Sequence, residues 1–463
     1  MNKLYTTLLI ACLAAGFTAC NDDDCEDLHL GNLAHYPNVL KGTFPTESQV
    51  LELGETLEIT PELLNPEEAT YSWLVNGKEY STEPTFSYKI DNPCRANLTC
   101  IIKNKYGKVE MSTSFSSNHD FSKGFFYIAD GTFNFYDKEK KVTYPDCYAS
   151  LNAGKTLGMG NYDSANIIHS NGKFYILIKT STSNRDHFYV VDAKTLYYEN
   201  SAVVGANLSG LTILNEQYGL VTGDGIRRID LKSLNNVTVK DEYMFCFYNS
   251  MVYNGKVLTN DTYQKESKVK YYDANELISA KEGEAPAATE LNIIQKQKFN
   301  FVSAKDGNAY TLESTDEGCN IVKISKDFTS LEKTPATFQP TKGGYSDPTV
   351  RMAASESENV IYIPSADNTI YKYVIGDSGS LNEPFITADE SGLPITSLQL
   401  NQQSGELYVT YARKWENGNK IVVYSKDGKV LHTVDCGESV PSQILFNNSV
   451  SYTHLRAHET RED

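Results

Sequence analysis

A loose internal repeat across residues 121–450 constrains the fold of this chain more than any other feature. Each copy has a short strand pattern, a tight turn, an apolar strand, a loop and a strand that ends near Asp. The copies are GFFYIADGTFNFYDK (124–138), GKFYILIKTSTSNRDHFYVVDAK (172–194), YGLVTGDGIRRIDLK (218–232), GKVLTNDTYQKESKVKYYDAN (255–275), GNAYTLESTDEGCNIVKISKD (307–327), NVIYIPSADNTIYKYVIGD (359–377) and GELYVTYARKWENGNKIVVYSKD (405–427). A repeat of about 40 to 50 residues is typical of propeller blades.

The strand patterns at the two ends of this region predict how the ring closes. Inner-strand patterns such as ANIIHS (165–170) and ITSLQL (395–400) precede the later copies, but the first copy lacks one. The segment SQILF (442–446) is left over at the other end. In a closed propeller this strand would complete the first blade and join the two ends of the domain. We therefore predict seven blades; six or eight are alternatives, because the repeats diverge.

Residues 31–118 show strand periodicity outside the repeat. Apolar and polar residues alternate through this region, for example at Leu51, Leu53 and Trp73, which is typical of strands with one buried face. The pair Asn76-Gly77 indicates a tight hairpin turn. A short region of alternating strands around one Trp predicts a small β-sandwich, so that the whole chain is expected to be all-β.

The first 19 residues have the three parts of a secretory signal. Lys3 supplies a positive charge, residues 4–17 are mostly apolar, and Thr18-Ala19 is a small pair that a peptidase accepts. The apolar run is too short to span a bilayer as a stable helix. Cys20 follows the small pair directly, and residues 20–30 form a polar, acidic tether ahead of the sandwich.

Two short motifs at this junction resemble bacterial lipoprotein signals. Residues 17–20, Phe-Thr-Ala-Cys, resemble a relaxed lipobox of the kind found in Bacteroidetes, with Phe where Leu is usual. The run Asp22, Asp23 and Asp24 resembles the tag that exports such lipoproteins to the outer face of the outer membrane. The resemblance implies a lipid on Cys20 and a protein anchored in the outer membrane that faces the cell exterior. The alternative is an ordinary cysteine followed by a solvated acidic segment.

The predicted sandwich also carries a family resemblance. YSWLVNGKE (71–79) and LTCIIKNKYGK (98–108) resemble the signature strands of a PKD-type immunoglobulin-like domain, with Trp73 as its core residue. The order of lipobox, acidic tag, sandwich and β-rich region resembles the PKD-like family lipoproteins of Bacteroidetes. This resemblance implies a place beside SusC/SusD-type TonB-dependent transporters.

Charge and cysteine content exclude several classes of function. A formal net charge of −17 disfavours nucleic acid as a partner, since binding it needs neutralising Lys and Arg. Beyond Cys12 in the signal and Cys20, seven scattered cysteines remain, an odd number that does not suggest a disulfide framework. Cys94 and Cys100 could bridge, but the strand pattern around Cys100 favours a buried thiol. No CxxC pair indicates zinc, and we predict neither a metal nor a cofactor.

The sequence does not indicate catalytic residues. GDSGS (376–380) resembles the nucleophile region of chymotrypsin-like proteases, but it falls at a strand end, and no segment supplies the His base. We interpret it as a turn. The acids that recur at strand ends are likewise interpreted as turn caps: Asp192, Asp230, Asp273 and Asp427. A carboxylate pair for glycoside hydrolysis depends on three-dimensional spacing, so a glycan-degrading hydrolase or lyase stays an alternative.

Loops on one face of the propeller supply the candidate binding residues. The loops between second and third strands, and those between blades, emerge on the same face. They would present Arg185, His187, Lys265, Tyr345, Arg413, Lys414 and Trp415. Trp415 stands out because its loop is polar and offers a large ring no evident core, and such rings often anchor partners. The alternative is a ring folded back on its own blade.

These observations favour a non-catalytic surface accessory. Such a protein would bind a nutrient, either an oligopeptide or a glycan, or dock on a SusC/SusD-type transporter. A structural or adhesive surface protein is a further alternative. Residues 451–463, SYTHLRAHETRED, resemble translated sequencing adapter, so we interpret this tail as non-native and place no site there.

Overall fold

The structure is a computed structural model that describes residues 35–159, 164–180, 185–208, 210–243, 250–260, 267–341, 349–387 and 391–447. The chain divides into two compact units. The first extends to Asn118 without residues 92–94, and the second comprises residues 92–94 and everything from His119 onward. The predicted signal, tether and tail lie outside the described residues. No helix within the described ranges is long and apolar enough to cross a bilayer.

The first unit is a β-sandwich. Its strands are β1 (Gln49–Glu52), β2 (Thr56–Ile59), β3 (Thr70–Val75), β4 (Lys78–Ser81), β5 (Phe86–Lys89), β6 (Arg95–Asn104) and β7 (Gly107–Asn118). One sheet has the order β1-β7-β6-β3-β4, and β2 pairs with β5 in the other. All neighbours are antiparallel except β1 and β7, which run parallel.

Trp73 fills the centre of the sandwich, as predicted. Its side chain is 0% exposed, and its ring lies 5.1 Å from Phe86 and 6.4 Å from Phe44, measured between centroids. The indole Nε1 donates a hydrogen bond to the Glu83 carbonyl (2.8 Å), which satisfies the one polar atom of this buried ring. The predicted hairpin is confirmed, because the turn residues between β3 and β4 both have the positive φ that a type I′ turn requires.

The second unit contains seven sheets of three or four strands among its described residues. In chain order their strands are β8 (Gly124–Ala129), β9 (Thr132–Asp137), β10 (Val142–Tyr144) and β35 (Pro441–Leu445); β11 (Ser164–Ser170), β12 (Lys173–Lys179), β13 (Asp186–Asp192) and β14 (Tyr198–Gly205); β15 (Gly210–Ile213), β16 (Tyr218–Asp230) and β17 (Asn236–Tyr243); β18 (Met251–Tyr253), β19 (Lys256–Asn260), β20 (Ser267–Asp273) and β21 (Thr289–Gln295); β23 (Val302–Ser303), β24 (Ala309–Ser314), β25 (Cys319–Ile324) and β26 (Leu331–Ala336); β28 (Ala353–Ala354), β29 (Val360–Pro364) and β30 (Ile370–Val374); and β31 (Ile395–Leu400), β32 (Leu407–Tyr411), β33 (Asn419–Tyr424) and β34 (Val430–Gly437).

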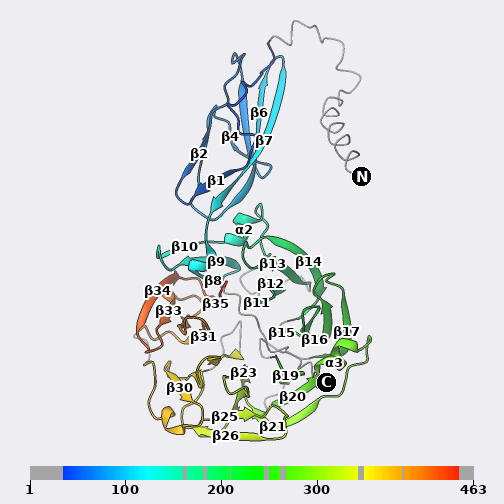
Figure 1. The fold of residues 1–463 in the computed structure, drawn as a ribbon, viewed down its shortest axis with the longest axis vertical. Coiled ribbons are helices and arrows are strands. Elements are labelled where there is room, and N and C mark those ends of the chain that lie inside the picture. The colour runs from blue at the N-terminus through cyan, green and yellow to red at the C-terminus, as the bar shows by residue number, and fades with distance from the viewer. Residues whose placement is uncertain are drawn as a thin grey trace, which may run out of the picture. The chain divides into compact units, whose positions relative to one another are not determined.

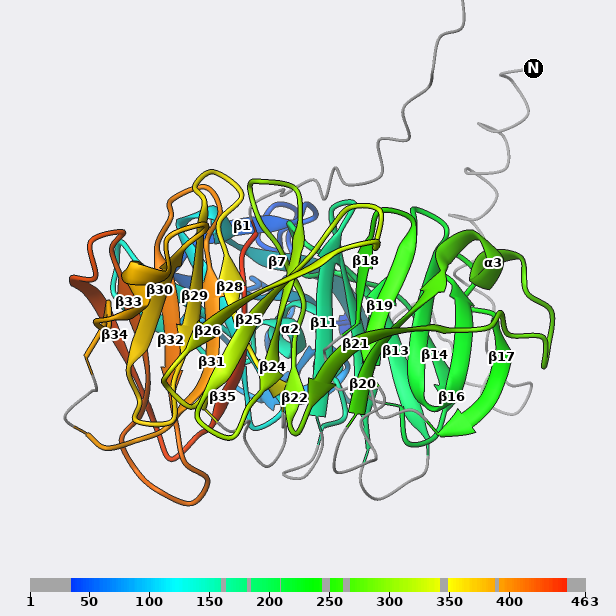
Figure 2. The ribbon, with the colours of Figure 1, turned by 90° about the horizontal axis from the view of Figure 1, so that it is seen from below.

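These sheets follow one another around a ring, with their strands stacked from the centre outward (Figure 1). Figure 2 shows the same sheets from the side. Each repeat identified in the sequence supplies the second and third strands of one sheet, except the copy at 218–232, which forms the single long strand β16. The remaining elements are short: β22 (Lys298–Phe299) paired with β27 (Thr349–Val350), the helices α2 (Cys147–Leu151) and α3 (Ala274–Ser279), and the 3₁₀ turns η3 (Phe121–Lys123) and η4 (Ser378–Leu381).

The core of this unit lies between adjacent sheets. Residues 174–178 of β12 are all buried, because both faces of the sheet pack against neighbours. This double burial explains why β12 is a continuous apolar run while the sandwich strands alternate. The all-β prediction, a sandwich followed by a propeller, is confirmed.

The predicted closure is also confirmed. Strand β35, from the C-terminal end, pairs antiparallel with β8 and completes the first sheet on its inner side. Ile444 is fully buried there, in one cluster with Phe125 and Tyr408. On the other side, the amide of Gln443 accepts from Ile167 N (3.1 Å) and donates to Ile167 O (2.6 Å), which joins β35 to β11. The ring is therefore held at this point by both ends of the domain.

Candidate functional site

The loop between β32 and β33 presents Trp415 to solvent. Arg413 O accepts from Glu416 N (3.2 Å), which closes a four-residue turn with Trp415 as its third residue. The Trp415 backbone is left-handed, with φ +64°, at a position where Gly is usual. Its side chain is 80% exposed, and Lys414 Nζ lies 5.1 Å from the ring centroid. The ring therefore does not fold back on its blade.

Buried and ionic contacts hold this turn in place. Arg413 Nη1 contacts both carboxylate oxygens of Glu416, at 3.0 and 3.1 Å. Asn419, the first residue of β33, is fully buried. Its Oδ1 accepts from Arg413 N (2.8 Å), and its Nδ2 donates to the carbonyls of Glu416 and Glu438, each at 3.2 Å. One amide thus joins the Trp415 turn to the segment that leads to the next sheet.

Asp186 has the same role in the second sheet. It is the first residue of β13, fully buried, and its two oxygens accept from Thr180 N (2.9 Å) and Leu208 N (2.5 Å). Burial raises the pKa of this carboxyl, and the two backbone hydrogen bonds oppose the rise. At Asp186 the inter-sheet partner is a donor, whereas at Asn419 it is a carbonyl. The choice of acid or amide therefore matches the hydrogen-bonding character of each partner.

Exchanging these two side-chain types is expected to destabilise the propeller. Asp186→Asn places an amide NH₂ against Leu208 N–H, and Asn419→Asp places a carboxylate against two carbonyls. Because both positions are buried, each change should lower the free energy of unfolding by about 1–3 kcal/mol. Urea unfolding followed by circular dichroism measures this. Asp427→Asn, at an exposed turn without such a contact, is the control, and an equal loss there would contradict the interpretation.

Of the seven predicted binding residues, the five that the structure describes come from two separate sheets. Arg185 is exposed immediately before β13, whose sheet is separated from the Trp415 sheet by the sheet of β35. His187 corrects the expectation of a loop residue: it lies within β13, half-buried, opposite Val203, and its ring stacks on Tyr189. Lys265 and Tyr345 lie outside the described residues, as do Cys20 and residues 22–24.

Most of the recurrent acids cap turns, as predicted. Asp192 Oδ1 accepts from the backbone of Lys194 (3.1 Å) and Thr195 (2.9 Å). Asp230 and Asp273 make the equivalent bonds to the second and third residues after them. Asp427 is different: the structure shows its own N–H donating to Ser425 Oγ (3.3 Å).

The GDSGS segment is a turn, and its contacts are local. Asp377 caps η4 by accepting from Gly379 N (2.9 Å). Ser380 Oγ donates to Asp377 O (2.6 Å) and accepts from Val374 N (2.9 Å). The serine hydroxyl is therefore occupied by the turn itself, which confirms the structural interpretation of this motif.

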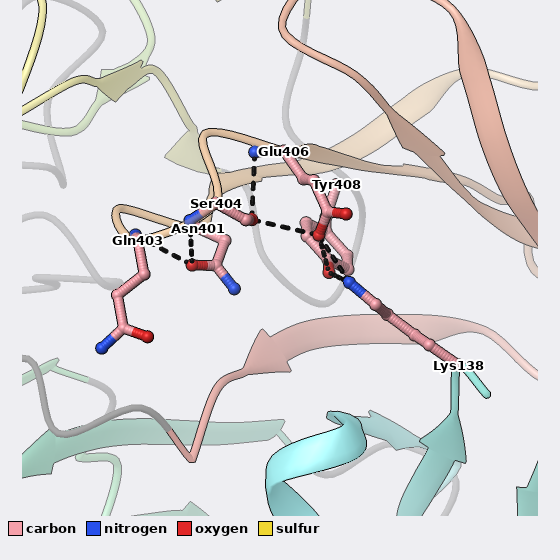
Figure 3. Close-up of polar contacts among 6 residues, drawn as sticks. All are labelled: Lys138, Asn401, Gln403, Ser404, Glu406 and Tyr408. Carbon is pink, nitrogen blue, oxygen red and sulfur yellow. Dashed lines mark hydrogen bonds and ion pairs between the residues drawn. The ribbon is translucent and has the colours of Figure 1, made fainter.

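A polar cluster joins the two ends of the domain at the closure of the ring. Lys138 follows β9, and its Nζ lies 2.6 Å from Glu406 Oε2 and 3.4 Å from Tyr408 OH (Figure 3). Tyr408 OH and Ser404 Oγ also donate to that oxygen, at 2.9 and 3.1 Å. Because Glu406 precedes β32 and Trp415 follows it, this cluster and the Trp415 turn lie at opposite ends of the strand. Sequence analysis did not identify this cluster, because its members are 268 residues apart.

Glu406→Gln is expected to weaken the closure at neutral pH. Burial alone raises the pKa of Glu406, but the bonds from Lys138 and Tyr408 outweigh it, so the pKa is lowered. The ion pair therefore stabilises the fold above pH 4.5, the ordinary value, and loses this effect as the pH falls through the folded-state pKa. At pH 7 the free energy of unfolding of the variant should be about 1–3 kcal/mol lower than that of the wild type, and in acid the two values should become equal. Unfolding free energies across pH measure this; a constant difference would contradict it.

The buried acids of the described ranges have structural partners. Besides Asp186, they are Asp137, which accepts from Glu139 N and Lys140 N, and Glu313, which contacts Lys333 Nζ at 2.7 Å. Within the same ranges, no three His, Cys, Asp or Glu side chains are grouped so that they could hold a metal ion. Of the cysteines described, Cys100, Cys147, Cys319 and Cys436 are free thiols.

Comparison with protein families gives two matches. Residues 37–104 match the model of a PKD-like domain, which confirms the predicted PKD-type sandwich. Residues 121–447, more than half of the chain, match the model described as a domain of unknown function (DUF5074). This chain belongs to the DUF5074 family. No curated protein matches it.

A solved structure extends the family assignment. This DUF5074 protein is 82% identical to a crystal structure described as a quinonprotein alcohol dehydrogenase-like protein from Bacteroides thetaiotaomicron. The match covers 90% of this chain and 100% of that one, with a TM-score of 0.87. A functionally unknown protein from Desulfotomaculum acetoxidans and the dihydro-heme d1 dehydrogenase NirN match at TM-scores of 0.46 and 0.45 with 10% identity, which is too low to carry an argument.

Proposed function

We propose that this DUF5074 protein is a non-catalytic accessory on the outer-membrane surface, anchored by a lipid on Cys20 and addressed by Asp22, Asp23 and Asp24. In this role the propeller binds a nutrient, an oligopeptide or a glycan, or docks on a SusC/SusD-type transporter. The PKD-like sandwich then separates the propeller from the membrane. The Trp415 turn is the contact we assign to that partner.

The exposure of Trp415 carries the proposal. The Trp415 indole is 80% exposed, so it leaves a large apolar surface in water. The left-handed backbone at this residue lowers the stability of the fold by a further amount of about 1–2 kcal/mol. Asn419 and the Arg413–Glu416 pair nevertheless hold the turn in this conformation. Strained, exposed aromatic residues on a braced turn are typical of partner contacts, because a rigid ring loses little entropy when it is buried.

Capture of partners from the outer membrane tests the proposal. The tagged, lipidated protein is purified from detergent-solubilised outer membranes, and stoichiometric partners are identified by mass. We expect a TonB-dependent barrel with a SusD-like lipoprotein, and loss of that partner with Trp415→Ala. Val430→Ala, which shortens an apolar side chain 58% exposed on β34 of the same sheet, is the matched control. Recovery of the protein alone would count against docking, and glycans and peptides would then be screened for binding.

A further inference from the structure

The sandwich end at which the described chain begins has a distinct surface. We call it the anchor end and define it by His35, Tyr36, Leu64, Lys103, Lys105, Tyr106 and Lys108. The His35 ring stacks on Tyr106 with centroids 4.9 Å apart, and Asn104 Nδ2 donates to His35 O (2.8 Å). Tyr36 OH donates to Lys108 O. The entering chain is thus fixed to the hairpin between β6 and β7.

The anchor end combines lysines with exposed apolar groups. Lys103, Lys105 and Lys108 are all exposed, in a chain whose net charge is −17. Leu64 is 63% exposed and Tyr106 is 38% exposed, although each is large enough to fill a core position. Opposing charges lie close by. Glu68 pairs with Lys105 (3.2 Å), and Glu62, Glu67 and Glu110 are also exposed. Lysines, tyrosines and single apolar side chains are the set that favours a membrane interface.

Chain length places this end near the bilayer if Cys20 carries the lipid. Fifteen residues separate Cys20 from His35 (35 − 20), and a chain of that length reaches at most about 50 Å when fully extended. A tether of this kind keeps the anchor end at a high local concentration beside the lipid surface. Weak contacts, such as those of single lysines with headgroup phosphates, are then sufficient for docking.

We propose that the anchor end docks on the phosphate-bearing headgroup surface of the membrane, with the lysines at the phosphates and Leu64 and Tyr106 at the interface. This inference rests on the lipid anchor of the proposed function. It adds a second, non-covalent contact that sets which end of the sandwich faces the bilayer.

Lysine labelling tests the docking with a matched control inside the same sandwich. The full-length lipidated protein is inserted into phosphatidylglycerol–phosphatidylcholine vesicles, acylated with an amine reagent and compared by mass with detergent-solubilised protein. Lys105 has a side chain 59% exposed and pairs with Glu68; Lys89 is 60% exposed and pairs with Asp91. Lys89 ends β5 at the other end of the strands, opposite Thr56. Lys105 and Lys89 are therefore similar in exposure and in having an acidic partner, and they lie at opposite ends of the sandwich.

We expect labelling of Lys105 to fall about fivefold on vesicles, the effect of one lysine at an anionic surface, while Lys89 is unchanged. High salt should reduce the protection, because it screens exposed charges. The double variant Lys105→Glu with Lys108→Glu should label Lys103 equally on vesicles and in detergent. Lys89→Glu should leave the protection of Lys103 on vesicles unchanged. Equal labelling of Lys105 and Lys89 on vesicles, or protection of both, overturns the proposal.

A second anchoring route separates this proposal from the proposed function. If the protein does not float with vesicles, the lipid anchor fails. The Cys20→Ser chain with an N-terminal histidine tag is then held on nickel-chelating lipid in the same vesicles. Protection of Lys105 there still supports the docking surface, and its absence overturns it.

Discussion

A chain that ends at Val440 is expected to lose the folded propeller, because it lacks β35. Ile444 is fully buried and Leu445 is nearly so. Shortening either side chain to Ala would lower the free energy of unfolding by about 2–5 kcal/mol. Together they approach the whole stability of a typical domain, about 5–15 kcal/mol. The truncation also leaves β8 without its inner partner and Ile167 without Gln443. We expect loss of cooperative unfolding in calorimetry.

A chain that ends at Asn447 is the matched control. It lacks only residues 448–463, which include the adapter-like tail, and retains all of β35. Its melting temperature should equal that of the complete chain. If the chain that ends at Val440 also unfolds cooperatively, at the melting temperature of the chain that ends at Asn447, then strand β35 does not close the ring in solution.

Trp415→Gly is expected to separate partner binding from stability. The loss of a central aromatic anchor should weaken binding of the partner recovered from the membrane by about 2 kcal/mol or more, roughly 30-fold. Gly accepts a φ of +64° without strain, whereas Ala does not, so the Gly variant should be more stable than Trp415→Ala by about 1 kcal/mol. Calorimetric titration and thermal unfolding measure the two effects.

The two tryptophans of the chain provide a direct check on this prediction. Trp73 is 0% exposed and Trp415 is 80% exposed, so iodide should quench only the emission of Trp415. Partner binding should protect that emission, and Trp415→Gly should remove the quenched component. Unchanged quenching in the complex would show that the partner contacts another surface.

Prediction from the sequence succeeded wherever a feature repeats or is local. The seven repeats, the unpaired strand at 442–446 and the Asn76-Gly77 turn depend on period and on neighbouring residues, and each has the expected counterpart in the structure. The same holds for GDSGS, whose Ser380 bonds to its own turn. The prediction that His187 lies in a loop was wrong, because strand pairing sets where the loop ends and the composition of the loop does not show this pairing.

The sequence by itself therefore determined the all-β class, the two domain types and the closure of the ring, because these follow from the spacing of apolar residues along the chain. Only the tertiary structure decided which polar residues are buried and whether the Trp415 ring is exposed or folded back on its blade. Asn419 and Asp186 look like ordinary loop residues until their partners, Glu438 and Leu208, come from another segment. Lys138 meets Glu406 only when the ring closes. Burial and hydrogen bonding of this kind depend on contacts between distant segments, and no local pattern records them.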